Sequence, residues 1–389
     1  MLRESSLADR IEFDDSPLQN GFNPYYLTIC SQQNDPLCVN GKEVINLATN
    51  NYLGLSSDQR IKEAYINAIK KYGVSMCATP IAGGYTELFE QTRSKLASFI
   101  GVEDVLLYPS CYQANNGIFQ SVARKEDLIL FDRFAHSSLI QGIRSVGCKA
   151  LPFSHNDPAA LEDILKRYTD FPKVFVVTES VFSTEGSIAP FKEICNVCSA
   201  YHAIPVVDDS HGIGVIGKSG KGILSHSGMP DYNGIYTTSL GKAFANNCGV
   251  VGGSRELIRY LSYCSSHLVY STAIQPAVIA GINKTIDIVL EEYEFRSKKV
   301  FGYSELMKRI LTENGFHVAN SAAPITSIIT GSSDCTVDFA RKLFYNSVFS
   351  TPFIYPSVRK NDGRIRLIAG ANIKESSIER VIDLFEHWD

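Results

Sequence analysis

The sequence predicts an α/β protein whose larger domain carries a mostly parallel sheet. In the middle of the chain, short apolar runs alternate with amphipathic stretches of helical length. The apolar runs are continuous rather than alternately apolar and polar, which is typical of parallel strands covered by helices on both faces. At 389 residues, the chain is about two to three times the usual length of one domain. We therefore expect two domains.

Six strands and four helices are predicted in this central part. The strands are expected at residues 105–108, 128–131, 174–177, 204–207, 235–238 and 249–252. The helices are expected between them, at residues 113–122, 137–146, 158–168 and 190–201. Alternation of strand and helix favours a parallel sheet, because each helix returns the chain to the start of the next strand. The large α/β domain is expected to span residues 46–285.

The two ends of the chain have different patterns. Residues 1–45 are expected to form an N-terminal extension. A long helical pattern covers about residues 275–314. Beyond it, short segments at residues 323–329, 352–356 and 364–368 alternate with helical patterns near residues 335–345 and 374–388. This mixture predicts a smaller C-terminal α+β domain at residues 286–389.

Charge and hydropathy exclude several functions. The chain has 37 basic and 41 acidic residues, a net charge of −4, so we expect no basic surface for nucleic acid. It contains no apolar run of about 18 residues, the length that a membrane-spanning helix needs. Its first residues are charged and lack the apolar segment of a secretory signal. We expect a cytoplasmic protein.

The cysteines predict free thiols rather than a disulfide scaffold. Ten cysteines are scattered along a long chain, unlike the dense spacing of small disulfide-rich domains. Cys195 and Cys198 form a C-x-x-C pair, with no second pair or histidine pair nearby at the spacing of metal ligands. On a helix, residues three apart share a face. We expect buried, inert thiols and no metal site.

Lys242 is the most distinctive candidate for catalysis. It follows a predicted strand and lies in an otherwise apolar stretch after small and hydroxylic residues. Burial lowers the pKa of a lysine ammonium, and a lysine with a lowered pKa can form a Schiff base with a carbonyl group. A lysine in a surface turn would give the same local sequence, so this alternative stays open.

A second candidate is the acidic segment that ends the strand at residues 204–207. Asp208 and Asp209 lie where open α/β sheets bind ligands, and His211 follows three residues after Asp208. An aspartate there could pair with a protonated pyridine nitrogen, and a histidine could bond to a phenolic oxygen. Asp208 could equally cap the next helix. The nearby glycines do not match a dinucleotide-binding motif.

Two turns between strands and helices complete the set. Small residues from Ser110 to Gly117 join a strand to a helix, and the free N–H groups at such a helix start bind phosphate. Tyr112 would lie near whatever that phosphate carries. His136, at the turn before the helix at residues 137–146, could stack on an aromatic ring. Each turn alone is also compatible with an ordinary structural role.

Together, these features indicate pyridoxal 5′-phosphate, and the sequence resembles the α-oxoamine synthase family of fold-type I enzymes. The family's motifs occur in the same order over most of the chain. They match residues 50–55, 110–115, 134–139, 181–186, 208–214, 239–242, 270–272 and 364–367. The resemblance implies a large domain with a mostly parallel, seven-stranded sheet and a smaller C-terminal domain. It also implies a homodimer with shared active sites.

The resemblance also implies a role for each site residue. Lys242 holds the cofactor covalently and acts as the base, Asp208 pairs with the pyridine nitrogen, and His136 stacks on the ring. Contacts to the phenolic oxygen are implied for His211 and Ser183. Contacts to the phosphate are implied for Ser110, Cys111, Tyr112, Ser239 and, from the neighbouring subunit, Ser271 and Thr272. Substrate binding is implied for Asn50, Ser357 and Arg366.

The implied reaction condenses an amino acid with an acyl thioester, carried by coenzyme A or a carrier protein, to give an α-amino ketone after loss of carbon dioxide. One segment departs from the family. The stretch at residues 76–89 lacks the expected arginine, and Phe89 stands where a histidine usually falls. This departure is more similar to the autoinducer synthases of the family, which use medium-chain acyl groups. An aminotransferase or aldolase reaction on the same fold stays an alternative; a non-catalytic subunit would lack Lys242.

Overall fold

A seven-stranded sheet forms the centre of the structure. The computed structural model describes residue 18 and residues 22–388. The strand order is β3-β9-β8-β7-β6-β4-β5. The strands are β3 (Asp104–Tyr108), β4 (Leu128–Asp132), β5 (Lys149–Phe153), β6 (Val174–Glu179), β7 (Ile204–Asp208), β8 (Ile235–Ser239) and β9 (Gly249–Gly253). Only β9 among them runs antiparallel to its neighbours, β3 and β8. The mostly parallel sheet predicted from the sequence is confirmed.

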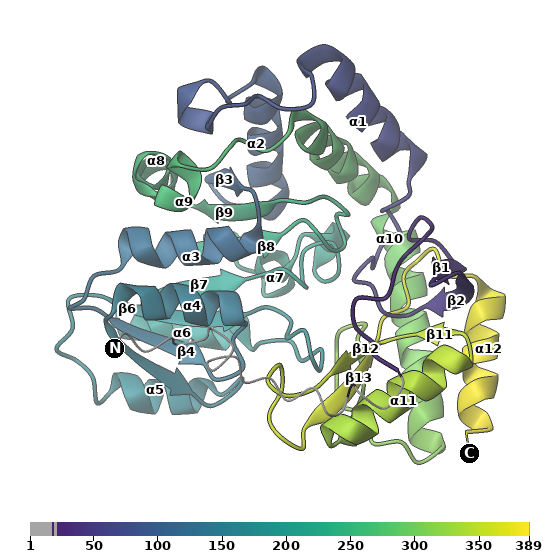
Figure 1. Ribbon diagram of the computed structural model, residues 1–389. Coiled ribbons are helices and arrows are strands. Elements are labelled where there is room, and N and C mark those ends of the chain that lie inside the picture. The colour runs from purple at the N-terminus through teal and green to yellow at the C-terminus, as the bar shows by residue number, and fades with distance from the viewer. Residues whose placement is uncertain (1–17, 19–21, 389) are drawn as a thin grey trace, which may run out of the picture.

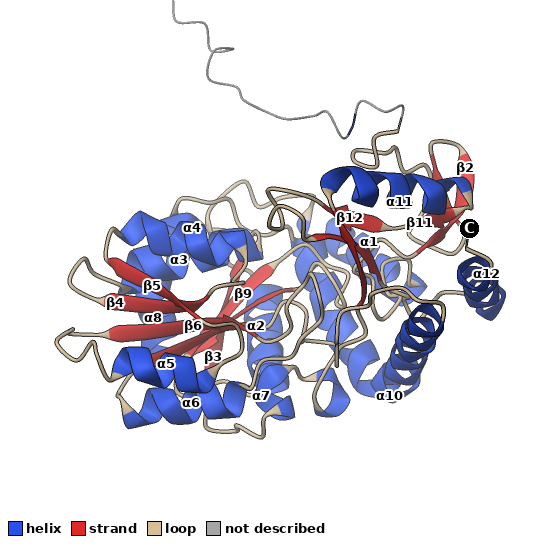
Figure 2. Ribbon diagram, turned by 90° about the horizontal axis from the view of Figure 1, so that it is seen from below, coloured by secondary structure: helices blue, strands red, loops and turns tan. Residues whose placement is uncertain are grey.

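Helices cover both faces of this sheet, as the continuous apolar strands require. Figure 2 shows α3 (Cys111–Val122) and α4 (Ser137–Val146) on one face. On the other face lie α5 (Pro158–Leu165) and α6 (Phe191–Ala200). All four predicted helices are present. The helix predicted to begin at residue 113 begins two residues earlier, because the Ser110 hydroxyl caps it by accepting a bond from the Gln113 N–H.

Strand β5 was not predicted from the sequence. Its residues include Lys149 and Pro152, and most of them are exposed or half-buried. The strand lies at the edge of the sheet, beside β4 alone. Charged residues and proline are tolerated on an edge strand because one side of the strand makes no ladder bonds. The apolar run that marks the six predicted strands is therefore missing here.

Further helices surround the sheet or lead away from it. They are α1 (Gln59–Tyr72), α2 (Glu87–Ile100), α7 (Ile223–His226), α8 (Arg255–Cys264) and α9 (Ser266–Val269). The helix α10 (Pro276–Glu313) matches the long helix predicted at residues 275–314. In Figure 1 it extends from the side of α1 and α2 toward the C-terminal elements. Pro276 is the first residue of this helix. Proline suits this position because an N–H group there would have no acceptor within the helix.

The C-terminal elements form a separate small sheet. Its strand order is β10-β13-β12, from β10 (Thr326–Gly331), β13 (Gly363–Leu367) and β12 (Thr351–Phe353), and all pairs are antiparallel. The helices α11 (Ser333–Tyr345) and α12 (Glu375–Glu386) pack in this part (Figure 1). This arrangement agrees with the α+β pattern predicted for the C-terminal residues.

A third sheet joins the beginning of the described chain to its end. The hairpin of β1 (Leu37–Val39) and β2 (Lys42–Asn46) pairs in parallel with β11 (Val348–Phe349) through β2. Ile45 and Leu47 share a hydrophobic cluster with residues of α10, α11 and α12. Strand β2 spans the predicted boundary between residues 45 and 46. The domain limits at residues 45 and 285 therefore stay predictions.

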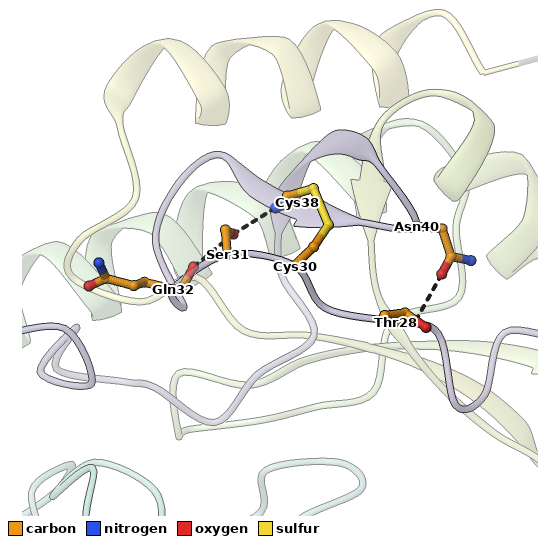
Figure 3. Close-up of a disulfide and its surroundings, with 6 residues drawn as sticks. All are labelled: Thr28, Cys30, Ser31, Gln32, Cys38 and Asn40. Carbon is orange, nitrogen blue, oxygen red and sulfur yellow. Dashed lines mark hydrogen bonds between the residues drawn. A yellow bond between two sulfur atoms is a disulfide. The ribbon is translucent and has the colours of Figure 1, made fainter.

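The cysteine prediction needs one correction. Cys30 and Cys38 form a disulfide, with 5.3 Å between their Cα atoms, where only thiols were expected. Figure 3 shows the bond beside Ser31, whose hydroxyl accepts a hydrogen bond of 2.9 Å from the Cys38 N–H. The other eight cysteines are free, and Cys195 and Cys198 are buried in α6 as expected. No cluster of metal-ligating side chains occurs in residues 22–388.

The membrane prediction holds for the described part of the chain. None of its helices combines the length and the apolar composition that a bilayer crossing requires. The long helix α10 carries charged residues along its length.

Candidate active site

Lys242 lies in a packed turn between β8 and β9. The turn is held by backbone hydrogen bonds from Leu240 N–H to Cys248 O and from Ala245 N–H to Lys242 O. The residues that flank the lysine, Leu240, Ala243 and Phe244, are at most 1% exposed. Burial lowers the pKa of Lys242, while the nearby Asp208, Cys111 and Glu179 oppose this shift. The turn therefore presents an ammonium group to the interior.

Asp208 and Asp209 point to different surroundings because successive residues alternate at the end of a strand. Asp208 is 4% exposed, and it accepts hydrogen bonds from Asn115 Nδ2 at 2.7 Å and from Ser210 N–H at 3.0 Å. The buried thiol of Cys111 lies 3.8 Å from Asp208 Oδ2. Three donors thus hold the Asp208 carboxyl group in one orientation.

Asp209 is instead part of the core beside the sheet. It accepts hydrogen bonds from the Tyr236 hydroxyl at 2.8 Å and from the Ile223 N–H at 3.1 Å. A Cβ atom at Gly222 would come within 1.9 Å of its carboxylate, so the backbone passes very close to it. Burial raises the pKa of Asp209 to about 7. Asp208 is therefore the member of the pair that faces the candidate site.

His211 contacts Tyr52 from the N-terminal motif at residues 50–55. The Tyr52 hydroxyl and His211 Nδ1 are 2.8 Å apart, and both residues are buried. Burial, and then the positive charges of Lys242 and Arg366, lower the pKa of His211 well below its ordinary value. The imidazole is therefore neutral at pH 7. Tyr52 did not stand out in the sequence except as part of that motif.

His136 caps α4 from the end of the neighbouring turn. Its Nδ1 lies 2.8 Å from the Ser138 hydroxyl, and its backbone N–H donates to Glu179 Oε1 at 2.7 Å. Burial lowers the pKa of His136. Burial and the adjacent Asp208 raise the pKa of Glu179 well above its ordinary value. Glu179 was not among the predicted site residues. It is the last residue of β6, two positions beyond the end of the strand predicted at residues 174–177.

The start of α3 provides free donors beside these side chains. As the first residues of the helix, Cys111 and Tyr112 have N–H groups with no acceptor inside the helix. Gly249 allows a close approach, since a Cβ there would lie 2.3 Å from the Ser110 carbonyl carbon. The Tyr112 side chain is 50% exposed. This helix start, which follows the end of β3, can therefore bind an anion.

The remaining predicted residues fall into three places. Ser239 lies at the end of β8, where its hydroxyl accepts a bond from the Gly241 N–H. Ser271 lies near the start of α3, with its hydroxyl 3.5 Å from Gln113 Nε2; Thr272 next to it is exposed. Ser357 is also exposed, in a turn where its N–H donates to Ile354 O. No contact in the described part of the chain joins Ser357 to the other candidates.

Arg366 lies on β13, so the small sheet contributes this residue to the candidate site. It is 6% exposed and donates to the Ser183 carbonyl at 3.1 Å, and its guanidinium lies 5.0 Å from the centre of the Phe353 ring. Burial lowers its pKa. Within the described residues, Arg366 Nε and Asn50 Oδ1 are buried without a hydrogen-bond partner. A buried donor and a buried acceptor without partners indicate a place for a polar ligand.

Most of the departing segment at residues 76–89 is exposed or half-buried, and Phe89 at its end is buried. Phe89 is 2% exposed and packs on Tyr85, with their ring centres 4.8 Å apart. It belongs to the first turn of α2. Phe89 therefore packs in the core at the position where the resemblance to the family implies a histidine.

Comparisons with known proteins agree with this fold. The family described as "Aminotransferase class I and II" matches residues 42–385. The chain belongs to this family.

Within the family, the chain is an α-oxoamine synthase. It is 36% identical to the 8-amino-7-oxononanoate synthase of Thermoanaerobacter pseudethanolicus, over 92% of this chain and 91% of that protein. The protein of the same name from Alkaliphilus oremlandii is 35% identical over 90% of this chain and 88% of that protein.

Solved structures share the fold. The serine palmitoyltransferase of Sphingomonas wittichii superposes with a TM-score of 0.91 at 22% identity, covering 97% of this chain and 95% of that one. An 8-amino-7-oxononanoate synthase from Francisella tularensis superposes with a TM-score of 0.76 at 24% identity, covering 88% of this chain and 97% of that one. At these identities, the likeness supports the fold.

Proposed function

We propose that this chain is a pyridoxal 5′-phosphate-dependent acyltransferase that condenses an amino acid with an acyl thioester to an α-amino ketone. The observation that carries the proposal is that a half-buried Lys242 lies close enough to the buried, hydrogen-bonded Asp208 for their charges to interact, at the carboxyl edge of the sheet. This arrangement supplies a nucleophilic amine and a fixed negative charge in one site.

The residues present fit the cofactor. The α3 start offers N–H groups to the phosphate, with the hydroxyls of Ser110 and Ser239 nearby. Asp208 would hold a proton on the pyridine nitrogen, and His136 would stack on the ring. Neutral His211, fixed by Tyr52, and Ser183 would bond to the phenolic oxygen. When bound, the cofactor withdraws electrons and stabilises negative charge on the substrate α-carbon.

The chain's own residues then hold the substrate and move its protons. Lys242 would hold the cofactor and would take the proton from the substrate α-carbon, because its lowered pKa leaves a larger neutral fraction. Arg366 would bind the substrate carboxylate through its free Nε, with Asn50 Oδ1 accepting from the substrate amino group or a water molecule. The exposed Ser357 is the weakest member of this predicted substrate set.

The name of the relatives suggests a first substrate pair. The compound 8-amino-7-oxononanoate divides, at the bond between its carbons 7 and 8, into an alanine-derived fragment and a seven-carbon dicarboxylic acyl group. We propose L-alanine and the thioester of heptanedioic acid as this pair. Because Phe89 and the neighbouring segment depart from the family, the thioester of a medium-chain monocarboxylic acid is the second candidate.

The proposed assembly is a homodimer with shared sites. Tyr112 and Tyr270, which are 50% and 85% exposed, flank the α3 start and the adjacent segment. Exposed aromatic residues beside a binding site suit a subunit interface. In this proposed dimer, the exposed Thr272 would contact the phosphate bound by the other subunit. We also propose a cytoplasmic location, in keeping with eight free cysteines; the exposed Cys30 would then be reduced in the cell.

Absorbance spectroscopy and product analysis test the function. The purified protein, loaded with cofactor, should show a visible band that borohydride reduction fixes to Lys242. L-alanine should change this band, and adding either thioester should release thiol and carbon dioxide. Mass spectrometry of the α-amino ketone then identifies the acyl group. If the visible band survives in Lys242→Ala, or if the amino group is transferred without release of thiol, the proposal is refuted. The control is Lys218→Ala, at an exposed lysine.

A further inference from the structure

A chain of charged side chains connects the large sheet to the small one, outside the candidate site. It begins at Asp132, which ends β4 and is fully buried. His155, which follows β5, places its Nδ1 3.0 Å from Asp132 Oδ1 and its Nε2 3.1 Å from Glu185 Oε1. Arg364 of β13 places its guanidinium 3.5 Å from Glu185 Oε2. Four side chains of alternating charge thus bridge the two sheets.

The same turn that holds Glu185 also contacts Arg366. The turn follows β6, and it is closed by hydrogen bonds from Phe182 N–H to Ser187 O and from Gly186 N–H to Phe182 O. Its Ser183 carbonyl accepts the bond from Arg366. Arg364 and Arg366 are two apart on one strand and therefore share a face. The turn is thus fixed to β13 at two points, and one of them is the residue proposed to bind the substrate carboxylate.

Neighbouring groups hold these four charged side chains in one arrangement. The Ser187 hydroxyl donates to Glu185 Oε1 and lies 3.0 Å from His155 Nε2. The His155 ring packs against Phe134 and Phe182, with ring centres 4.6 and 4.3 Å apart. Phe134 is two residues before His136, which is proposed to stack on the cofactor. The imidazole therefore has little freedom to move.

The charge on His155 is what holds the two carboxylates together. Burial alone would lower the pKa of His155. The bonds to Asp132 and Glu185 outweigh burial and raise this pKa to about 9. Burial raises the pKa of Glu185, but its bonds to His155, Thr184 and Ser187 lower it overall. The guanidinium groups of Arg133 and Arg359 lie 5.3 and 5.4 Å from the centre of the Phe134 ring. Loss of the imidazolium proton would remove the positive charge between Asp132 and Glu185.

We propose that Asp132, His155, Glu185 and Arg364 form a positioning network that sets the pose of Ser183 and Arg366 and thereby the affinity for the amino-acid substrate. This inference rests on the proposed function, because it needs Arg366 to bind the substrate carboxylate. None of the four side chains touches the reacting groups. The network should therefore act on binding of the amino acid and leave the later steps nearly unchanged.

The sign of the pH dependence follows from the charge. Below pH 8, His155 is charged and the network is complete. As the pH rises through about 9, the imidazolium loses its proton and the turn loses its tie to β4. Affinity for the amino acid should therefore fall above pH 9, while affinity for the thioester should not. A glutamine at position 155 keeps two hydrogen-bonding groups and has no charge to lose.

The experiment compares wild-type holoenzyme with His155→Gln and with Arg364→Met and Arg364→Lys. Binding of L-alanine is followed by the absorbance change of the cofactor between pH 7 and 10. We expect the Kd at pH 7.5 to rise about tenfold in His155→Gln and Arg364→Met, with recovery in Arg364→Lys and kcat within about threefold. The fall of wild-type affinity above pH 9 should be absent in His155→Gln. His226→Gln, at an exposed histidine of α7, is the matched control.

Hydrogen exchange of the apoenzyme gives a readout independent of activity. His155→Gln should speed exchange in residues 180–188 and 363–367 and leave α10 unchanged. If exchange rises but the Kd and its pH profile equal those of the wild type, the network is only structural and the inference is wrong. If the wild type itself binds no amino acid, the proposed function fails and the inference falls with it. The two failures are therefore distinguishable.

Discussion

Asn115 donates a 2.7 Å hydrogen bond to Asp208 from the second turn of α3. The same amide nitrogen lies 2.9 Å from the Ser138 hydroxyl, which in turn lies 2.8 Å from His136 Nδ1. Asn115 is fully buried. One amide group thus connects the carboxylate proposed to pair with the cofactor nitrogen to the histidine proposed to stack on the cofactor ring.

Replacing Asn115 by alanine should weaken cofactor binding. Asp208 would lose one of its donors, so its negative charge would be less favourable and its pairing with the pyridine nitrogen weaker. We expect the cofactor Kd to rise about tenfold, which corresponds to roughly one charge-assisted hydrogen bond. Equilibrium dialysis against pyridoxal 5′-phosphate measures this change. Asn116→Ala is the control on the same helix, because the Asn116 amide donates only to backbone carbonyls; an equal loss in both variants would contradict the assignment.

Tyr52→Phe should impair turnover more than it impairs folding. The substitution removes the hydroxyl that lies 2.8 Å from His211 Nδ1, and it leaves the imidazole free to rotate. We expect kcat to fall about tenfold, with a loss of about 1 kcal/mol in the free energy of unfolding. Steady-state kinetics and urea denaturation measure the two effects.

The control for Tyr52 is Tyr293→Phe. Tyr293 also makes a buried hydrogen bond, from its hydroxyl to the Val215 carbonyl at 2.8 Å, but it lies on α10 away from the candidate site. It should lose similar stability and keep kcat. A normal kcat in Tyr52→Phe would show that His211 needs no support from Tyr52.

Asp209→Asn should change how stability depends on pH. Burial raises the pKa of Asp209 from 3.8 to about 7 in the folded state. Between these values the folded state holds a proton that the unfolded state has lost, so this residue makes the free energy of unfolding fall as the pH rises. The difference between variant and wild type should therefore move in favour of the variant from pH 4 to pH 7, by at most about 4 kcal/mol.

Thermal unfolding at pH 4, 5, 6 and 7 measures this difference. The matched variant is Asp231→Asn, which makes the same substitution at an exposed position in the loop before β8. A constant difference between Asp209→Asn and the wild type over this range would mean that Asp209 is ionised in the fold at pH 4.

Reduction of the Cys30–Cys38 disulfide should lower stability without abolishing the fold. The bond closes a short loop, with a sequence separation of 8, for which loop-closure entropy gives about 2.5 kcal/mol. Denaturation with and without a dithiol reductant measures the loss, and the Cys30→Ser/Cys38→Ser variant should not respond to the reductant. Alkylation of intact cells should find both thiols free if the protein is cytoplasmic.

The elements that were predicted from the sequence are those with a local cause. The six predicted strands are marked by apolar runs such as residues 174–177. The helix α4 begins and ends where predicted, and Gly147, just after it, adopts a left-handed conformation with φ of 72° that ends the helix. Strand β5 lacked such a run. Its place was set by pairing with β4, a relationship that no short window of sequence contains.

The contacts within the site were harder to predict, because they join distant parts of the chain. The order of motifs predicted Lys242, Asp208, His211 and Arg366 as site residues. The partners of these residues were not predicted: Tyr52 is 159 positions from His211, and Asn115 is 93 positions from Asp208. The Cys30–Cys38 pair was missed because spacing alone does not fix the direction of two Cβ atoms.

The pairing of β2 with β11 has a consequence for how the protein is made. Residues 45 and 46 leave the ribosome long before their partners Val348 and Phe349. The large sheet can assemble while translation continues, since its strands lie between residues 104 and 253. The cluster around Ile45 and Leu47 must wait for the C-terminal helices. Until then, a nascent chain exposes these apolar residues and the unpaired edge of β2, which makes this stretch a natural target for chaperones.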